Sequence, residues 1–140
     1  MSRFIQEHFV PVKFHIKEQK AMFDRFGVLW TPTQIILDAD GAERHRIEGF
    51  LPADDFLAQL EFGLARAAFE NQRYNEAGSL FREVVEHHPD AGVAPEARYW
   101  SGVSAYKASN DAAPLKETAQ DLSRRYPESE WTKRASVWAV

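Results

Sequence analysis

The stretch that decides the fold runs from residue 30 to residue 41 and reads WTPTQIILDADG. Its centre, residues 34–37, is a short apolar run of the kind that forms a buried strand. Asp38, Asp40 and Gly41 follow and are typical of turns, because Asp accepts nearby backbone hydrogen bonds and Gly tolerates positive φ. In residues 43–50, charged side chains then alternate with His or apolar ones. The stretch therefore predicts a β-hairpin.

The residues before the hairpin predict one more strand and a short helix. Residues 9–16 repeat apolar side chains at every second position, namely Val10, Val12, Phe14 and Ile16. This is the period of a strand with one buried face. Residues 17–26 have helical spacing instead, and Gly27 after them is a typical helix stop. We expect the order strand, helix, hairpin.

One long helix is predicted to join the two halves of the chain. It begins after Pro52 with Asp54 and Asp55 in its first turn, where carboxylates suit the helix dipole. Its apolar positions continue to about residue 70. Gly63 is the weak point, since Gly costs about 1 kcal/mol relative to Ala inside a helix. No linker is evident, so we divide the chain into residues 1–62 and 63–140 within a shared helix.

The second half is predicted to consist of helical hairpins with an internal repeat. Residues 74–88 have the apolar spacing of an amphipathic helix, and further helical patterns follow. Pro89 recurs as Pro127 and Trp100 recurs as Trp138, both after 38 residues. Ser129 is expected to cap a last helix. These observations indicate repeated helix pairs.

Composition and charge exclude several classes of function. The chain of 140 residues contains no Cys, which excludes disulfides, thiolate metal sites, iron–sulfur clusters and a Cys nucleophile. The net charge is −4 and neither half is basic, so we expect no nucleic-acid partner. No apolar run approaches the ~20 residues that span a bilayer, and the amino end is too short and polar for a signal peptide. We expect a cytoplasmic protein that does not bind membranes.

The helical half resembles tetratricopeptide repeats. The first unit has the leucine, tyrosine, alanine, aromatic residue and proline of that motif at Leu64, Tyr74, Ala77, Phe81 and Pro89. The second unit is degenerate: a leucine replaces the small alanine at Leu115, while the matching positions are Tyr99, Gly102, Tyr106 and Pro127. The resemblance implies two helix pairs, a terminal capping helix and protein partners. Two units are fewer than the three that an independent solenoid usually needs.

The first half resembles the carboxyl-terminal part of the thioredoxin fold. The resemblance is carried by residues 9–16, Gly27, Trp30-Thr31-Pro32-Thr33 and the Asp-Gly hairpin. In that family the Thr–Pro bond is cis, so we expect a cis bond at Thr31-Pro32, whereas only ~5% of X–Pro bonds are cis by chance. The family's first strands and its Cys-x-x-Cys helix belong upstream, and residues 2–8 resemble only the tail of that helix.

The missing thiols and the missing strand set two expectations. Disulfide exchange needs a low-pKa thiolate and a resolving thiol, and this chain has neither. We therefore expect a non-catalytic protein without a cofactor. In the family, a central strand lies between those resembling residues 9–16 and 34–37. Because unpaired buried backbone groups are costly, we expect a rearranged three-stranded sheet with homodimer contacts.

Two surfaces are candidates for binding. In thioredoxin-like proteins the backbone before the cis-proline pairs with an extended peptide, which implies a binding edge at Trp30, Thr31 and Pro32. The alternative, which we favour, is that Trp30 belongs to the core and the Thr-Pro-Thr sequence only shapes a turn. A helical groove is the second candidate, with Tyr74, Tyr99, Trp100 and Tyr106 as its lining. Aromatic residues at helical spacing more often fill the core between helices, and we expect most of this set to do so.

Metal and acid–base sites have simpler explanations. His87 and His88 are adjacent at a predicted helix end, and neighbouring side chains on a helix point about 100° apart, so we expect no metal site. The Asp38–Asp40 segment resembles the opening of a calcium loop but lacks the later acidic ligand. Helix capping accounts for Asp54 and Asp55.

These expectations define a fold class and a function. The fold is a truncated α/β thioredoxin-like unit of about three strands, followed by all-α tetratricopeptide-like hairpins. The function is a non-catalytic interaction or scaffold module that holds protein partners. The alternative is a truncated thiol–disulfide oxidoreductase or redox chaperone whose Cys-x-x-Cys segment lies upstream of Met1.

Overall fold

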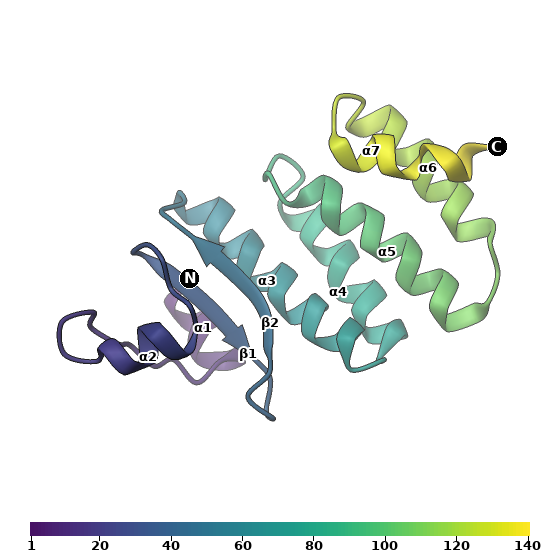
Figure 1. Ribbon diagram of the computed structural model, residues 1–140. Helices are drawn as coiled ribbons and strands as arrows, with labels where there is room; N and C mark the ends of the chain where they lie inside the picture. The colour runs from purple at the N-terminus through teal and green to yellow at the C-terminus, as the bar shows by residue number, and fades with distance from the viewer.

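The structure, a computed structural model, describes residues 1–140 and combines a small α/β unit with a stack of helices (Figure 1). In chain order, its elements are α1 (Ser2–His8), α2 (Lys20–Arg25), β1 (Thr33–Leu37), β2 (Glu43–Glu48), α3 (Ala53–Glu70), α4 (Tyr74–His87), α5 (Ala94–Ser109), α6 (Ala113–Arg125), α7 (Glu130–Ala135) and the 3-10 helix η1 (Ser136–Ala139). None of these helices has both the length and the apolar composition that crossing a bilayer requires.

The predicted hairpin is present as the antiparallel pair β1 and β2. Its turn is held by Asp38, whose Oδ1 accepts hydrogen bonds from the backbone N–H groups of Asp40 (3.0 Å) and Ala42 (3.1 Å). Gly41 has φ of +81°, in the left-handed region that Gly adopts without strain. The turn interpretation of this acidic segment is confirmed.

The predicted third strand is wrong. The sheet has two strands, and residues 9–16 form no ladder with either of them. The period-two pattern describes an extended chain, but a strand also needs a neighbour for its backbone groups. Phe9 packs against the apolar cluster of the hairpin, but residues 10–16 are exposed, and Val10 is 92% exposed.

The two faces of the hairpin meet different elements. One face, with Ile36 and Ile47, packs against Leu60 of α3, and Phe4 and Ile5 of α1 join the same apolar cluster. The other face is tied to the end of α2 through Arg46, which donates hydrogen bonds to the carbonyl oxygens of residues 26 and 27. Figure 1 shows α1 behind the sheet and α2 in front of it.

Helix α3 runs without a break through the joint between the two halves, as the sequence predicted. The structure also explains Gly63, which lies against the sheet. A Cβ at this position would be 2.1 Å from Cδ1 of Ile36 and 3.3 Å from Cβ of His45. Gly63, which lowers the intrinsic stability of the helix, therefore permits the close approach of α3 to the hairpin.

The helices after α3 stack in antiparallel pairs. Helix α4 packs between α3 and α5, and α6 packs against both α5 and α7. Helices α3, α5 and α7 therefore follow one another along one side of the stack, with α4 and α6 along the other (Figure 1). The main core lies between α3, α4 and α5 and is centred on Phe62, Ala77 and Phe81. Ser129 caps α7 as predicted, accepting a hydrogen bond from the N–H of Trp131 at 3.1 Å.

Candidate functional site

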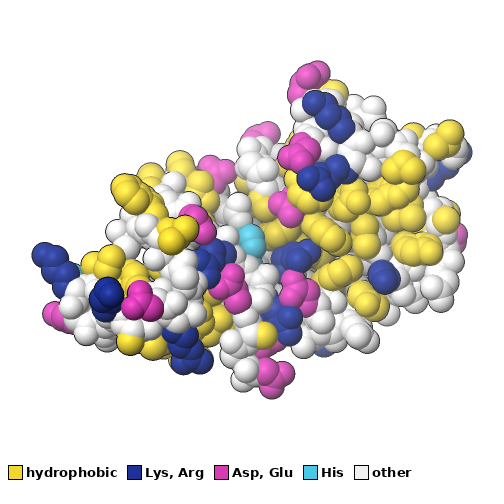
Figure 2. Space-filling model, viewed as in Figure 1, with side chains coloured by type: hydrophobic (Ala, Val, Ile, Leu, Met, Phe, Trp, Pro, Cys, Tyr) yellow, Lys and Arg dark blue, Asp and Glu magenta, His cyan; other side chains and the backbone are white.

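The helices α3, α5, α7 and η1 contribute a continuous set of rings, which we call the aromatic surface: Phe69, Tyr99, Trp100, Trp131 and Trp138. Phe69 meets Trp100 edge to face, with ring centroids 5.2 Å apart, and Tyr99 meets Trp100 at 5.5 Å. Tyr99 also contacts both other tryptophans, at 5.0 Å from Trp131 and 4.7 Å from Trp138. All five side chains are partly exposed. Figure 2 shows the corresponding hydrophobic area over α5 and α7.

Charged side chains frame the aromatic surface and restrict its rings. The Arg66 guanidinium lies 4.8 Å from the ring centroid of Trp100, and that of Arg134 lies 4.9 Å from Trp131. The indole N–H of Trp100 donates a hydrogen bond to Glu96 at 3.3 Å, and burial raises the pKa of the Glu96 carboxyl. Contacts of this kind fix rotamers, so the rings lose little entropy when a ligand covers them.

The structure brings together three of the four residues predicted for the helical groove. Tyr99 and Trp100 are in direct contact, and Tyr74 reaches them through Phe69, with ring centroids 5.3 Å apart. Tyr106 lies further along α5 and stays outside the ring stack, with 38% of its surface exposed. Tyr74, Tyr99 and Trp100 are partly buried, and Tyr99 and Trp100 pack against the buried clusters of the helical half.

Three members of the aromatic surface were not among the four residues predicted for the helical groove: Phe69, Trp131 and Trp138. Trp138 occupies the position that corresponds to Trp100 in the 38-residue repeat, so the repeat itself carried the signal. Phe69 follows Arg66 by three residues on α3, and residues at this spacing share a helix face.

The second candidate, the edge at Trp30, Thr31 and Pro32, lies at the start of the hairpin. The Thr31-Pro32 bond is cis, as the resemblance implied. The favoured expectation that Trp30 belongs to the core is wrong, because its side chain is 69% exposed. Its backbone carbonyl accepts a hydrogen bond from the Thr33 hydroxyl at 2.7 Å, which holds the turn. Leu29 and Phe50 are also largely exposed in this unit.

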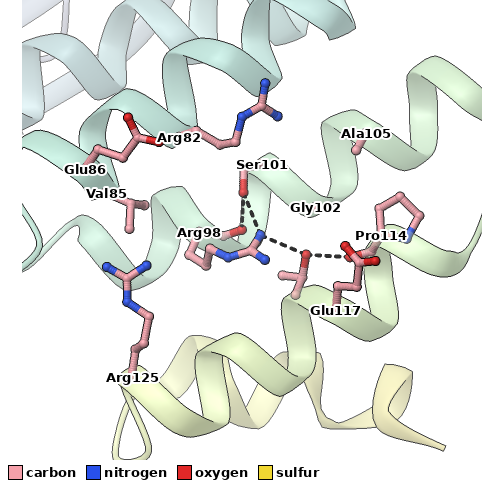
Figure 3. Close-up of a pocket in the computed structure, with 11 residues that line it drawn as sticks. Arg82, Val85, Glu86, Arg98, Ser101, Gly102, Ala105, Pro114, Glu117 and Arg125 are labelled. Atoms are coloured by element: carbon pink, nitrogen blue, oxygen red, sulfur yellow. Dashed lines mark hydrogen bonds between the residues drawn. The ribbon is translucent and has the colours of Figure 1, made fainter.

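A cleft of about 330 Å³ opens on the opposite side of α5, between α4 and α6 (Figure 3). Arg98 crosses it and is fully engaged: it donates to Asp121 at 2.6 Å and to the hydroxyls of Ser101 and Thr118 at 3.0 Å. Glu86 and Glu117 line the same cleft as Arg82 and Arg125, so its charge is mixed. The contacts of Arg98 with Asp121 and Thr118 join α5 to α6.

A cluster that the sequence analysis did not find joins α3 to the end of α4. The Glu61 carboxylate lies between two histidine rings, with Oε2 at 3.3 Å from Nδ1 of His87 and Oε1 at 3.2 Å from Nε2 of His88. Adjacent histidines were expected to diverge on a helix. Helix α4 ends at His87, however, and His88 has non-helical angles, φ −135° and ψ 58°, which allow both rings to face Glu61.

Comparison with known proteins finds two family models that match different parts of the chain. A family model described as a thioredoxin-like domain matches residues 1–64, and one described as a tetratricopeptide repeat matches residues 59–91. The two matches overlap at residues 59–64, which belong to α3. No curated protein and no solved structure is significantly similar to the chain. Both predicted resemblances are confirmed, and the repeat match covers the first helix pair.

Proposed function

We propose that this chain, which joins a thioredoxin-like domain to a tetratricopeptide repeat and contains no Cys, is a non-catalytic module that binds protein partners. Thiol–disulfide exchange is absent from this form because there is no thiol to carry it. Tetratricopeptide repeats point to protein interaction. The remaining question is which surface binds.

The observation that carries the proposal is the partly exposed aromatic surface along α3, α5, α7 and η1. Its five rings touch one another, remain partly exposed, and are held by Arg66 and Arg134. Burial of apolar area yields roughly 25 cal/mol per Å², and rings that are already ordered keep more of this gain. Tryptophan, tyrosine and arginine are also the residues that most often dominate binding energy. The surface therefore suits a peptide segment with apolar or aromatic anchors.

The test is selection of peptides from a displayed library against the full chain, followed by affinity measurement with variants. Trp131 is suitable for substitution because it lies on the short terminal helix α7 and is partly exposed. We expect Trp131→Ala to weaken a selected peptide at least ~10-fold, which corresponds to 1.4 kcal/mol, and Trp131→Phe to restore part of the affinity.

The matched control is Trp30→Ala, which removes an exposed tryptophan from the other unit. It should leave the affinity of the same peptide unchanged. Peptides that bind equally well to wild type and Trp131→Ala, or that lose affinity only with Trp30→Ala, would assign binding to a different surface.

A second binding function is supported by the hairpin edge. In the two-stranded sheet, each strand has one unpaired edge, and Trp30, just before β1, is exposed, as is Val10 of the same unit. Unpaired edges and exposed apolar side chains favour pairing with another chain. We assign this edge, with Trp30, Thr31 and Pro32, to a homodimer contact. Sedimentation at micromolar concentration should give a dimer that Trp30→Ser dissociates and Trp131→Ala does not; a monomer in both cases would contradict the assignment.

An oxidoreductase or redox chaperone would require thiols from a segment outside these 140 residues. Intact mass of the protein from its native host distinguishes the two functions. A product with two additional cysteines upstream of Met1 would favour the redox function, and a product of 16.0 kDa would favour the interaction module.

A further inference from the structure

The strongest feature that the proposed function leaves unused is the cluster of Glu61, His87 and His88. One ligand atom from each residue can be chosen so that all three lie within 4.8 Å of one another. Glu61 lies in the middle of α3, 26 positions before His87 at the end of α4, and His88 follows directly after that helix. The cluster is therefore a product of the fold.

Two contacts in the cluster, each to a different oxygen of Glu61, have the spacing found around a tetrahedral metal ion, while the three ligand atoms together lie within 4.8 Å. Zinc binds imidazole nitrogen and carboxylate oxygen at about 2.0–2.2 Å, so neighbouring ligand atoms around it are about 3.3 Å apart. The carboxylate oxygens of Glu61 are 3.3 Å and 3.2 Å from the nearest nitrogens of His87 and His88. The two imidazole rings are nearly perpendicular, at 87°, with centroids 6.0 Å apart. A cation between the three groups would replace hydrogen bonds by coordination with small side-chain movements.

Burial and charge favour an ion at this place. The side chains of Glu61 and His88 are only 14% and 12% exposed, whereas that of His87 is 56% exposed. Glu61 and His88 thus form the buried side of the site, and the side at His87 is open to solvent. The open side leaves a coordination position for water or another ligand. The side-chain contacts of the Glu61 carboxylate are with these two histidines, and no Lys or Arg lies within ion-pair distance of it.

We propose that Glu61, His87 and His88 bind one divalent transition-metal ion, with Zn²⁺ as the best match to two imidazoles and one carboxylate. Imidazole nitrogen suits zinc, copper and nickel, whereas magnesium and calcium prefer all-oxygen sites. The bound ion links the middle of α3 to the last turn of α4. It therefore stabilises the first helix pair independently of any peptide on the aromatic surface.

The experiment is calorimetric titration of Zn²⁺ into the full chain, with any affinity tag removed, accompanied by thermal unfolding. We expect one Zn²⁺ per chain and a rise in Tm, because a ligand that binds only the folded state stabilises it. Mg²⁺ should produce neither effect. Glu61→Gln and His88→Gln should each weaken Zn²⁺ binding at least tenfold.

Two further variants distinguish loss of the metal site from a folding defect and from unspecific Zn²⁺ binding. His87→Gln changes an exposed side chain, so it should fold normally and still weaken Zn²⁺ binding at least tenfold. His15→Gln removes an exposed histidine from residues 9–16 and should leave affinity unchanged. Absence of Zn²⁺ binding at millimolar concentration, or equal affinity in wild type and His87→Gln, would overturn the site. Neither result would affect the peptide-binding test.

Discussion

Replacing Gly102 by Ala should destabilise the protein, although Ala is the better helix former. Gly102 is buried in α5, where α5 crosses α6. A Cβ at this position would lie 2.1 Å from Oγ1 of Thr118, 2.7 Å from its Cβ and 2.9 Å from its Cγ2. Three atoms of one short, branched side chain are in the way, so rotation of a flexible end cannot relieve the contact.

The surroundings of Thr118 set the magnitude. Its hydroxyl donates to the carbonyl of Pro114 at 2.7 Å and accepts from Arg98 at 3.0 Å, and the residue is 1% exposed. Inserting a methyl group into a packed core costs about 1–3 kcal/mol, and disturbing one of these hydrogen bonds adds about 1 kcal/mol. The intrinsic helix preference for Ala returns about 1 kcal/mol. We therefore expect Gly102→Ala to lower the free energy of unfolding by about 1–3 kcal/mol.

The assay is urea unfolding followed by circular dichroism, with Gly78→Ala as the matched control. Gly78 is also buried inside a helix, but a Cβ there would meet its nearest atom, Cβ of Ser104, at 3.4 Å, an ordinary contact. Gly78→Ala should therefore gain about 0.5–1 kcal/mol. The reasoning is refuted if Gly102→Ala is as stable as Gly78→Ala, because helix preference alone would then govern both positions.

Three further changes test the α/β unit. Gly63→Ala should cost about 1 kcal/mol or more in the same assay, since Ile36 is buried and has little room to move away; a gain in stability would contradict the close approach. Gln34→Met should stabilise by about 1 kcal/mol, because it removes a buried side-chain carbonyl that has no hydrogen-bond partner, and a loss would indicate an unrecognised donor. Burial lowers the pKa of His45 below its ordinary 6.5, while Gln59 accepts its hydrogen bond at 2.6 Å. As pH falls below about 6.5, His45 therefore takes up a proton in the unfolded chain before it does so in the folded one, and the free energy of unfolding declines. His45→Gln should flatten that decline. An unchanged dependence of the free energy of unfolding on pH would exclude this role of His45.

Local signals made much of the fold predictable from the sequence. The hairpin follows from the Asp38–Gly41 turn, and the helix boundaries follow from Pro89, Pro127 and the Ser129 cap, because each acts through residues close in the chain. The predicted strand at residues 9–16 failed since pairing depends on a partner that these residues lack.

The site was less predictable because it depends on contacts between distant residues. Phe69 and Trp138 join the aromatic surface only after α3, α5 and η1 have been brought together. The cluster around Glu61 needs both the packing of α3 on α4 and the end of α4 at His87. Gly63 illustrates the same limit. From the sequence alone, a glycine here only weakens the helix, whereas the structure shows that the neighbouring Ile36 leaves no room for a larger residue.

The two units are also joined by a chain of charges that runs from the hairpin turn to the aromatic surface. Arg44 contacts Asp38 and Glu70, both at 2.7 Å, and Glu70 in turn holds Arg66 at 2.8 Å. Arg66 is the cation that lies over Trp100. The hydrogen bond from Arg44 lowers the pKa of Asp38 to about 2, so this carboxylate stays charged at mildly acidic pH. The hairpin turn thereby helps to orient a residue of the aromatic surface, which gives the cysteine-free α/β unit a structural use that needs no redox chemistry.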